Sequence, residues 1–200
     1  IGYFFARKNF AFKKLIMSFL NLPLVLPPVV TGYLLLLLLG KNGPIGSLLL
    51  DYFNFTFAFK WTGAAFACAI MGFPLMVRSI KLAIEMIDTK IEKAAMTLGA
   101  NRFIVFFTIT FPLALPGVVA GFILSFARSL GEFGATVTFV SNIPGETQTL
   151  SAAIYTFLQI PNGEYFAMRL TIISILISIA ALVFSEIIFD RFIKYNREKN

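Results

Sequence analysis

Residues 103–127 read FIVFFTITFPLALPGVVAGFILSFA, a run of 25 residues without a charged side chain between Arg102 and Arg128. About 20 mostly apolar residues in a helix are enough to cross the hydrocarbon layer of a bilayer, so this run predicts a membrane-spanning helix. Three similar runs are bounded by charged residues: Lys14 to Lys41, Lys60 to Arg78, and Arg169 to Glu186. We therefore expect an all-α integral membrane protein with four transmembrane helices, near residues 15–40, 61–80, 112–131 and 168–190.

The composition agrees with a chain that folds in lipid. Of the 200 residues, 58% are hydrophobic and only 14% are charged, and the mean hydropathy is +0.84. A soluble domain carries about 25% charged residues, so an ordinary water-soluble protein is excluded. The single Cys and the absence of His exclude a disulfide framework, a zinc site and histidine-based acid–base catalysis. We expect no resident metal and no cofactor.

The basic residues predict the orientation in the membrane. With the four spans above, three basic residues fall on one side, Arg128 lies inside a span, and thirteen fall on the other side: Arg7, Lys8, Lys13, Lys14, Arg78, Lys81, Lys90, Lys93, Arg102, Arg191, Lys194, Arg197 and Lys199. Because Lys and Arg collect in cytoplasmic loops, residues 80–110 and the C-terminus at 190–200 are expected in the cytoplasm. Residues 41–60 and 141–167 are expected outside. Topology thus explains the net charge of +7, and a nucleic-acid partner is not expected.

No repeat or linker divides the chain, so we expect a single membrane domain over residues 1–200. Residues 1–6 read as the last turn of an apolar helix, which predicts at least one further helix before Ile1. Prolines fall within the first three predicted spans: Pro23, Pro27, Pro28, Pro74, Pro112 and Pro116. Such residues kink membrane helices and are tolerated where a cavity or a neighbour satisfies the freed carbonyls. Four kinked helices are few for a closed transporter, so a homodimer is expected.

A short amphipathic helix is predicted inside the cytoplasmic loop at about 85–111. Thr89 and Glu92 have the spacing of a capping box, and Gly99 suits a left-handed helix end. Apolar residues recur at helical spacing between them: Ile91, Ala94, Ala95 and Leu98. This face either packs on the chain's own neighbours or docks a cytoplasmic partner, and periodicity alone favours the first.

A second amphipathic helix is predicted at the outer face, at about 147–159. It follows the turn at 142–145 and carries apolar residues at helical spacing: Leu150, Ala153, Ile154, Phe157 and Leu158. Its start is too polar to cross the membrane. This helix either packs against the helical bundle or caps a pathway.

The end of the third predicted span concentrates polar side chains. An ionisable group inside a membrane costs about 2.5–3.5 kcal/mol on insertion scales and therefore usually faces a cavity or a partner. We predict a substrate pathway or gate formed by Ser125, Arg128, Ser129, Glu132, Thr136 and Thr138. The alternative is a self-contained Arg128–Glu132 pair one turn apart, or an Arg128 side chain that snorkels outward.

Several motifs resemble those of a known family. Ala94, Ala95, Gly99, Ile109 and Pro112 resemble the cytoplasmic EAA signature of binding-protein-dependent ABC import permeases, although Lys93 replaces its Glu, beside Glu92, and Phe111 replaces a Leu. Within that superfamily, four stretches resemble the ModB-type molybdate permeases: LPLVLPPVV at 22–30, FPLMVR at 73–78, SLGEFGAT at 129–136 and VSNIPGET at 140–147. The resemblance covers essentially the whole chain.

The resemblance implies a type I ABC importer permease with a MetI-like helical bundle in the cytoplasmic (inner) membrane. It also implies a homodimer, two cytoplasmic ATPase subunits and an external oxyanion-binding protein. The chain itself has no phosphate-binding G-x-x-x-x-G-K-[ST] loop, so ATP hydrolysis is expected on a partner and no catalytic residue here. The resemblance also implies that the cytoplasmic loop couples to the ATPase through the following residues: Glu92, Ala94, Ala95, Leu98, Gly99, Ile109 and Pro112.

The expected cargo is molybdate, and tungstate with it. Sulfate is the alternative, because sulfate permeases resemble this chain around Gly131 and Glu132. An alternative of a different class is an ATP-independent anion channel or secondary transporter that uses Arg128 and Glu132 as a gate.

Overall fold

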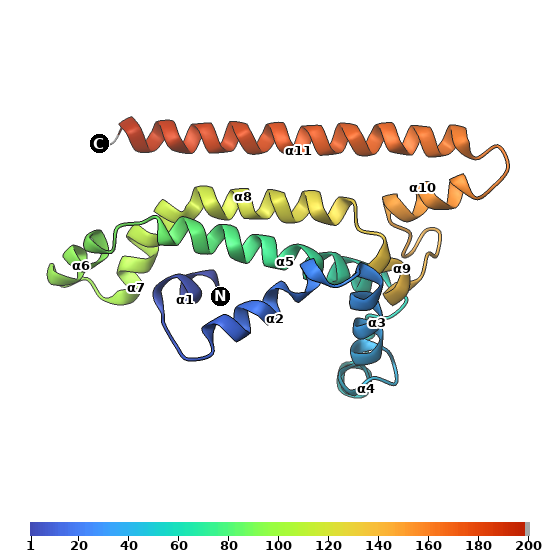
Figure 1. Cartoon of the computed structure of the whole chain (residues 1–200), viewed down its shortest axis with the longest axis horizontal. Helices are drawn as coiled ribbons and strands as arrows, with labels where there is room; N and C mark the ends of the chain where they lie inside the picture. The colour runs from blue at the N-terminus through green and yellow to red at the C-terminus, as the bar shows by residue number, and fades with distance from the viewer. Residues whose placement is uncertain (199–200) are drawn as a thin grey trace. The chain divides into compact units, whose positions relative to one another are not determined.

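The computed structural model describes residues 1–198, and every regular element in that range is a helix (Figure 1). Lys199, one of the predicted cytoplasmic basic residues, lies outside the described residues, as does Asn200. The elements are α1 (Gly2–Arg7), α2 (Lys13–Val25), α3 (Pro28–Leu39), α4 (Pro44–Phe53), α5 (Trp61–Glu85), α6 (Thr89–Thr97), α7 (Arg102–Val105), the π-helical turn η1 (Phe106–Thr110), α8 (Phe111–Leu130), α9 (Gly134–Val140), α10 (Leu150–Leu158) and α11 (Glu164–Glu198). The predicted all-α class is confirmed over this range.

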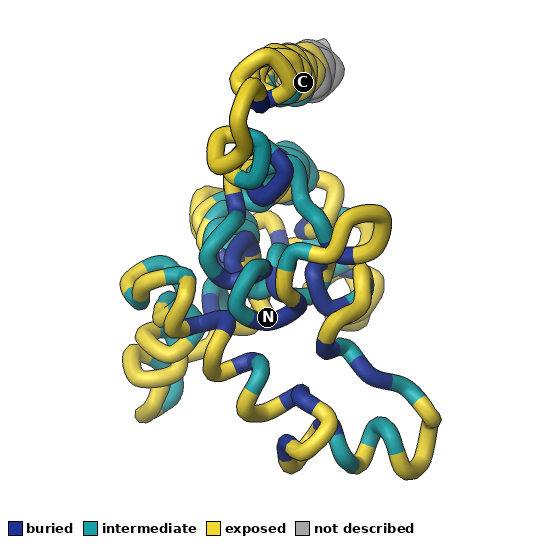
Figure 2. Tube along the Cα trace, turned by 90° about the vertical axis from the view of Figure 1, so that its right-hand side faces the viewer, coloured by how far each residue is buried: buried dark blue, intermediate teal, exposed yellow. Residues whose placement is uncertain are grey.

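Three continuous helices among the described residues are long and apolar enough to cross a membrane. They are α5, the run of α7, η1 and α8 from Arg102 to Leu130, and the Glu164–Phe184 part of α11. These helices overlap the second, third and fourth predicted spans, with bounds that differ by several residues. Most of the described side chains of α11 are exposed within this chain (Figure 2), as expected for apolar side chains that meet lipid or another protein.

The first predicted span, residues 15–40, is not one helix. Instead α2 and α3 are bent by 113° at the break between them, which makes a broken span or a re-entrant loop. Pro27 is the N-cap of α3 and Pro28 is its first residue. A proline disfavours helical backbone in the residue before it and donates no hydrogen bond itself. The pair of prolines therefore ends α2 and starts α3 in a new direction.

The third span begins at Arg102, ten residues before the predicted start at Pro112. The side chain of Asn101 caps its first turn. In η1 the backbone N–H of Phe111 donates to the carbonyl of Phe106, five residues back. A π turn of this kind relaxes the helix just before Pro112, whose ring would otherwise crowd the preceding turn. The helix therefore continues through a proline that was predicted to open it.

The described residues cluster into two compact units, and each takes parts of α2, α5, α8 and α11. Unit 1 comprises residues 1–18, 75–124 and 181 onward, and unit 2 comprises residues 19–74 and 125–180. The predicted single domain over residues 1–200 stays a prediction.

The core of unit 2 lies where α3, α5 and α9 meet. Its largest members are buried apolar side chains: Leu35 and Leu39 from α3, Met71 from α5, and Phe139 and Val140 from α9. The α3 and α9 backbones are so close that a Cβ on Gly32 would lie 2.4 Å from the carbonyl oxygen of Ala135. Only a glycine allows this approach.

In unit 1, the second half of α5 packs on the first half of α8. A Cβ on Gly117 would lie 2.2 Å from the Cβ of Ala83, so the two helices meet through small residues, as membrane helices commonly do. The buried members of this core are Ile84, Ile87 and Ala114. Ala6 of α1 packs against this core, so the end of α5 lies next to α1.

Candidate functional site

The start of α6 is fixed by a carboxylate. Asp88 is the N-cap, and its Oδ1 accepts the backbone N–H of Lys90 at 2.9 Å. The predicted capping box of Thr89 and Glu92 is therefore wrong, because Asp88 satisfies the first turn one residue earlier and Glu92 is bonded elsewhere.

The end of α6 is a left-handed turn at Gly99, as predicted. Gly99 has φ +90°, which favours a residue without a Cβ. Its N–H donates to Met96, and the N–H of Ala100 donates to Ala95. This pair of bonds is a Schellman motif, and it stops the helix at a fixed point.

The predicted apolar face of α6 is uncovered by the described residues of this chain. Leu98 is 89% exposed and Ile91 is 48% exposed, Ala94 is exposed, and Ala95 is half-buried. Packing on the chain's own neighbours does not account for these side chains. Exposed apolar side chains on one helix face are typical of an interaction surface, which makes this face of α6 a candidate for one.

The opposite face of α6 carries a buried polar network within unit 1. Glu92 is 8% exposed, and its Oε1 accepts from Arg7 Nη2 at 3.1 Å and from Thr110 Oγ1 at 2.7 Å. Arg7 Nη2 also donates to the carbonyl of Ile87 at 3.0 Å. Glu92 thus faces inward and joins α1, α6 and η1. Sequence reasoning missed Arg7 and Thr110, because no local pattern connects residues 85 or 18 positions apart.

The remaining residues of the EAA-type signature lie away from the exposed face of α6. Ile109 is half-buried in η1, and Pro112 is exposed in the first turn of α8. The signature therefore extends from α6, the helix with the exposed apolar face, through the π turn to which Glu92 is bonded, to the first turn of α8.

The second predicted group of residues lies at the end of α8, in unit 2. Arg128 Nη1 is 2.8 Å from Glu132 Oε2, with side-chain exposures of 31% and 1%. Glu132 Oε1 also accepts the backbone N–H of Ala135 at 2.9 Å. The carboxylate thus binds Arg128 on one side and the first turn of α9 on the other, where a negative charge is favourable.

The hydroxyl groups of that predicted group all donate to backbone carbonyls. Ser125 donates to Gly72 at 2.8 Å and Ser129 donates to Cys68 at 3.0 Å, which ties α8 to α5. Within and beside α9, Thr136 donates to Phe133 and Thr138 donates to Gly134. Because each hydroxyl has a single proton, only Arg128 in this group still offers donors to an anion.

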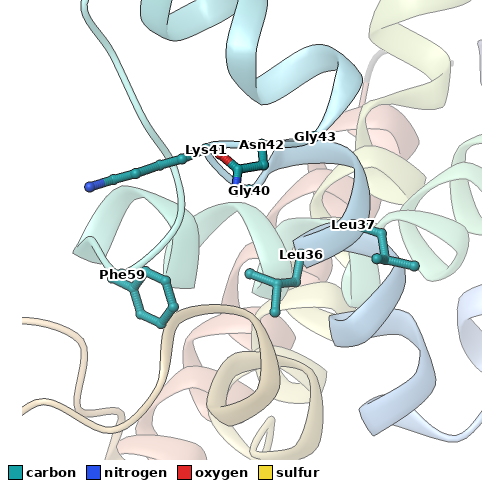
Figure 3. Close-up of a pocket in the computed structure, with 7 residues that line it drawn as sticks. All are labelled: Leu36, Leu37, Gly40, Lys41, Asn42, Gly43 and Phe59. Carbon is teal, nitrogen blue, oxygen red and sulfur yellow. The ribbon is translucent and has the colours of Figure 1, made fainter.

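A further hollow in unit 2, of about 320 Å³, lies in the turn between α3 and α4 and was not predicted (Figure 3). Its lining consists of Leu36, Leu37, Gly40, Lys41, Asn42, Gly43 and Phe59. In Figure 3 the ammonium group of Lys41 extends away from the two leucines. This lining lacks the convergent polar groups that a tight oxyanion site needs.

Three long apolar helices joined by shorter ones define a polytopic helical membrane protein. The family described as binding-protein-dependent transport system inner membrane component matches residues 1–194. The chain belongs to this family.

Individual relatives agree with the family. The chain is 60% identical over 189 residues to the molybdenum transport system permease protein ModB of Escherichia coli strain K12, covering 92% of this chain and 82% of the relative. It is 55% identical over 186 residues to the protein of the same name from Haemophilus influenzae, covering 93% and 81%. It is 40% identical over 145 residues to the sulfate transport system permease protein CysW of Synechococcus elongatus, covering 72% and 50%.

Proposed function

We propose that this chain is the membrane-spanning subunit of an ATP-driven importer that carries molybdate, and tungstate with it, across the cytoplasmic membrane. The relatives from Escherichia coli and Haemophilus influenzae, both named for molybdenum transport, support this substrate. Both match over more than nine-tenths of the chain, so the likeness includes α6 and the end of α8.

The observation that carries the proposal is the free apolar face of α6. The helix lies outside the three long apolar helices and leaves Ile91, Ala94 and Leu98 without cover. The chain has no phosphate-binding loop of its own, so the energy of ATP must arrive through contact with another protein. We assign this face to an ATPase subunit, with Ala95 and Gly99 at its edge. The chain would then be a non-catalytic subunit.

The full assembly in this proposal has two copies of the chain, two cytoplasmic ATPase subunits and an external oxyanion-binding protein.

The bias of Lys and Arg toward the loop that carries α6 supports a cytoplasmic position for that loop and for the C-terminus. Asn42→Cys and Lys90→Cys, each introduced after Cys68→Ser, test the orientation. An impermeant thiol reagent outside intact cells should label Asn42→Cys only, and labelling of Lys90→Cys alone would reverse the topology.

The substrate pathway is proposed at the end of α8, around Arg128. The charge of its guanidinium is partly neutralised by Glu132, and its remaining N–H groups can donate to an anion. A dianion in transit needs such a modest attraction, since tight binding would prevent release. The proposed pathway also includes four hydroxyl residues near Arg128, although each hydroxyl donates its proton to a backbone carbonyl: Ser125, Ser129, Thr136 and Thr138.

Sulfate is the second candidate substrate, because the Synechococcus relative is named for sulfate transport. Molybdate and sulfate are both tetrahedral dianions, so the chemistry at Arg128 suits either. An ATP-independent channel or secondary transporter is the candidate of a different class.

Reconstitution in proteoliposomes separates these possibilities. The chain, the ATPase and the binding protein of the same source are combined, and uptake of labelled molybdate is measured with and without ATP. We expect ATP-dependent uptake that excess tungstate suppresses and excess sulfate does not. Uptake without ATP would support the channel, and suppression by sulfate at equal concentration would support the sulfate permease.

A further inference from the structure

A groove of about 650 Å³ lies in unit 1, between the end of α1, the inner face of α6 and the first turns of the long helix that starts at Arg102. We call it the α1–α6 groove. Its cationic residues are Arg7, Lys8, Lys93 and Arg102, and its aromatic residues are Tyr3, Phe103, Phe106 and Phe107. In Figure 1 the elements that form it lie together at one end of α5.

The charge in this groove is positive. Glu92 is the one carboxylate among the described residues that line it, and Arg7 already neutralises it. Among the side chains that the structure describes (residues 1–184, 186 and 187), Lys8, Lys93 and Arg102 have no ion-pair partner. Three uncompensated cations around one groove attract an anion.

The wall of the groove is aromatic and exposed. Phe103 is 79% exposed and Phe107 is 64% exposed. Phe106 lies between them in the chain, with its ring 5.0 Å from that of Tyr3 and 5.1 Å from that of Phe107. Exposed rings of this size favour contact with hydrocarbon. A small inorganic anion would leave this wall without a function.

The helix that begins at Arg102 offers both polar and apolar surroundings at its start. It runs to Leu130, and its most apolar 18 residues have a mean hydropathy of 2.2. Because its 29 residues exceed the roughly 20 that cross the hydrocarbon layer, its ends reach past that layer into the headgroup region. The cations and the aromatic rings of the groove lie at the Arg102 end of this helix.

The groove is separate from the free face of α6. Thr89, Glu92, Lys93 and Met96 line the groove, whereas Ile91, Ala94 and Leu98 form the free face. These two sets each follow the 3.6-residue period and are offset from each other by two positions, so they lie on different sides of the helix. A ligand in the groove therefore leaves the free face open.

We propose that the α1–α6 groove binds an anionic phospholipid. Its phosphate contacts Lys8, Lys93 and Arg102, and one acyl chain lies along Phe103 and Phe107. Charge complementarity selects an anionic headgroup, since a zwitterionic lipid brings its own cation to the same place. Basic pockets beside membrane helices recognise lipid headgroups in this way.

The test measures lipid binding to the purified complex of permease and ATPase. After delipidation in detergent, phosphatidylglycerol, phosphatidylcholine and inorganic phosphate are titrated separately, and bound ligand is counted by native mass spectrometry. Lys93→Gln/Arg102→Gln removes two groove cations. Lys41→Gln/Lys60→Gln is the matched control, because it removes two cations that do not line this groove. We expect about thirtyfold weaker phosphatidylglycerol binding for the first variant, from two juxtamembrane cations, and parental binding for the control.

A second measurement uses the unmodified chain. Photoreactive phosphatidylglycerol should crosslink to a peptide that contains residues 102–107, and phosphatidylcholine with the same photoreactive group should not. Equal binding of both lipids would overturn the proposal, and so would a response to inorganic phosphate alone. If Lys93→Gln/Arg102→Gln released the ATPase subunit from the complex but still bound phosphatidylglycerol normally, the proposal would also be overturned, and the groove would be assigned to an acidic segment of the ATPase.

Discussion

Glu92 in unit 1 and Glu132 in unit 2 are both buried carboxylates, and each forms an ion pair with a different arginine. The partners of the two carboxylates come from very different places in the chain. Arg7 lies 85 residues from Glu92, and Thr110 adds a third segment to that network. Arg128 lies four residues from Glu132, and the next bond of Glu132 is to Ala135. The first network holds separate elements together, and the second organises one corner between α8 and α9.

The difference shows what each pair contributes. Breaking the long-range network frees α6, the helix with the exposed apolar face, from α1 and η1. Breaking the local pair affects only the corner between α8 and α9 and changes the charge beside the proposed pathway. In both cases the removal of one partner leaves a buried charge alone, which costs far more than the removal of both.

The largest effect is expected from Arg128→Ala. Glu132 is 1% exposed, so its carboxylate would stay buried without a counter-charge, at a cost of about 3–5 kcal/mol. We expect a marked loss of stability and molybdate uptake at least tenfold below the parent in proteoliposomes. The affinity of the separate binding protein for molybdate is measured alongside and should not change.

The double variant Arg128→Met/Glu132→Leu sharpens that result. Replacement of both charges by apolar groups should restore stability. Uptake should stay low if Arg128 attracts the anion. Parental uptake by this variant would show that the pair only braces the corner between α8 and α9.

The next effect is expected from Arg7→Met, which leaves Glu92 with Thr110 as its remaining side-chain partner. We expect a loss of about 3 kcal/mol in the free energy of unfolding, measured by denaturant titration in detergent. Arg7→Met/Glu92→Met should recover most of it, as a double-mutant cycle for a coupled pair requires. An Arg7→Met variant as stable as the parent would mean that α1 is not held through this network.

Leu98→Asp should act on assembly and leave the fold intact. Leu98 is 89% exposed, so the folded chain loses little, but a carboxylate in an apolar interface would be desolvated without a partner. We expect at least tenfold less ATPase bound in a pull-down and an unchanged thermal midpoint. Ile45→Asp, on the exposed side of α4, is the control and should bind the ATPase normally.

The smallest effect is expected from Ser129→Ala, which removes one hydroxyl bond between α8 and α5. Interhelical bonds of this kind contribute about 0.6 kcal/mol in a membrane protein. Ser178→Ala removes a bond within α11 only and serves as the control. If Ser129→Ala clearly lowered uptake without lowering stability, Ser129 would be assigned a role in the substrate pathway and not in helix packing.

The apolar spans could be predicted because the absence of charge over some 20 residues has one main explanation in a protein. The run after Arg102 and the first part of α5, up to Arg78, follow from that rule, whereas the continuation of α5 to Glu85 does not. The break at Pro27 and Pro28 was foreseen only as a kink. Its angle of 113° depends on how α3 packs against α9, which no local pattern contains.

The candidate site was predicted in part for the same reason. The exposed apolar face of α6 and the Arg128–Glu132 pair follow helical periodicity, so both can be predicted from residues that are close in the sequence. The inward direction of Glu92 does not, because Arg7 and Thr110 become its neighbours only through the fold. Asp88 was missed as the cap because Thr89 offers the commoner pattern one position later.

The π turn at η1 has a consequence for the length of this segment. A π turn holds one more residue than the α-helical turn it replaces while completing the same single rotation, whereas an extra residue in a regular α-helix adds about 100° of rotation. Deletion of a single residue between Val105 and Phe111 would therefore give a regular helix and keep Arg102 and the aromatic rings after it at nearly the same azimuth relative to α8. The wide turn lets the segment carry one additional residue before Pro112 without changing the side of the helix on which the groove residues lie.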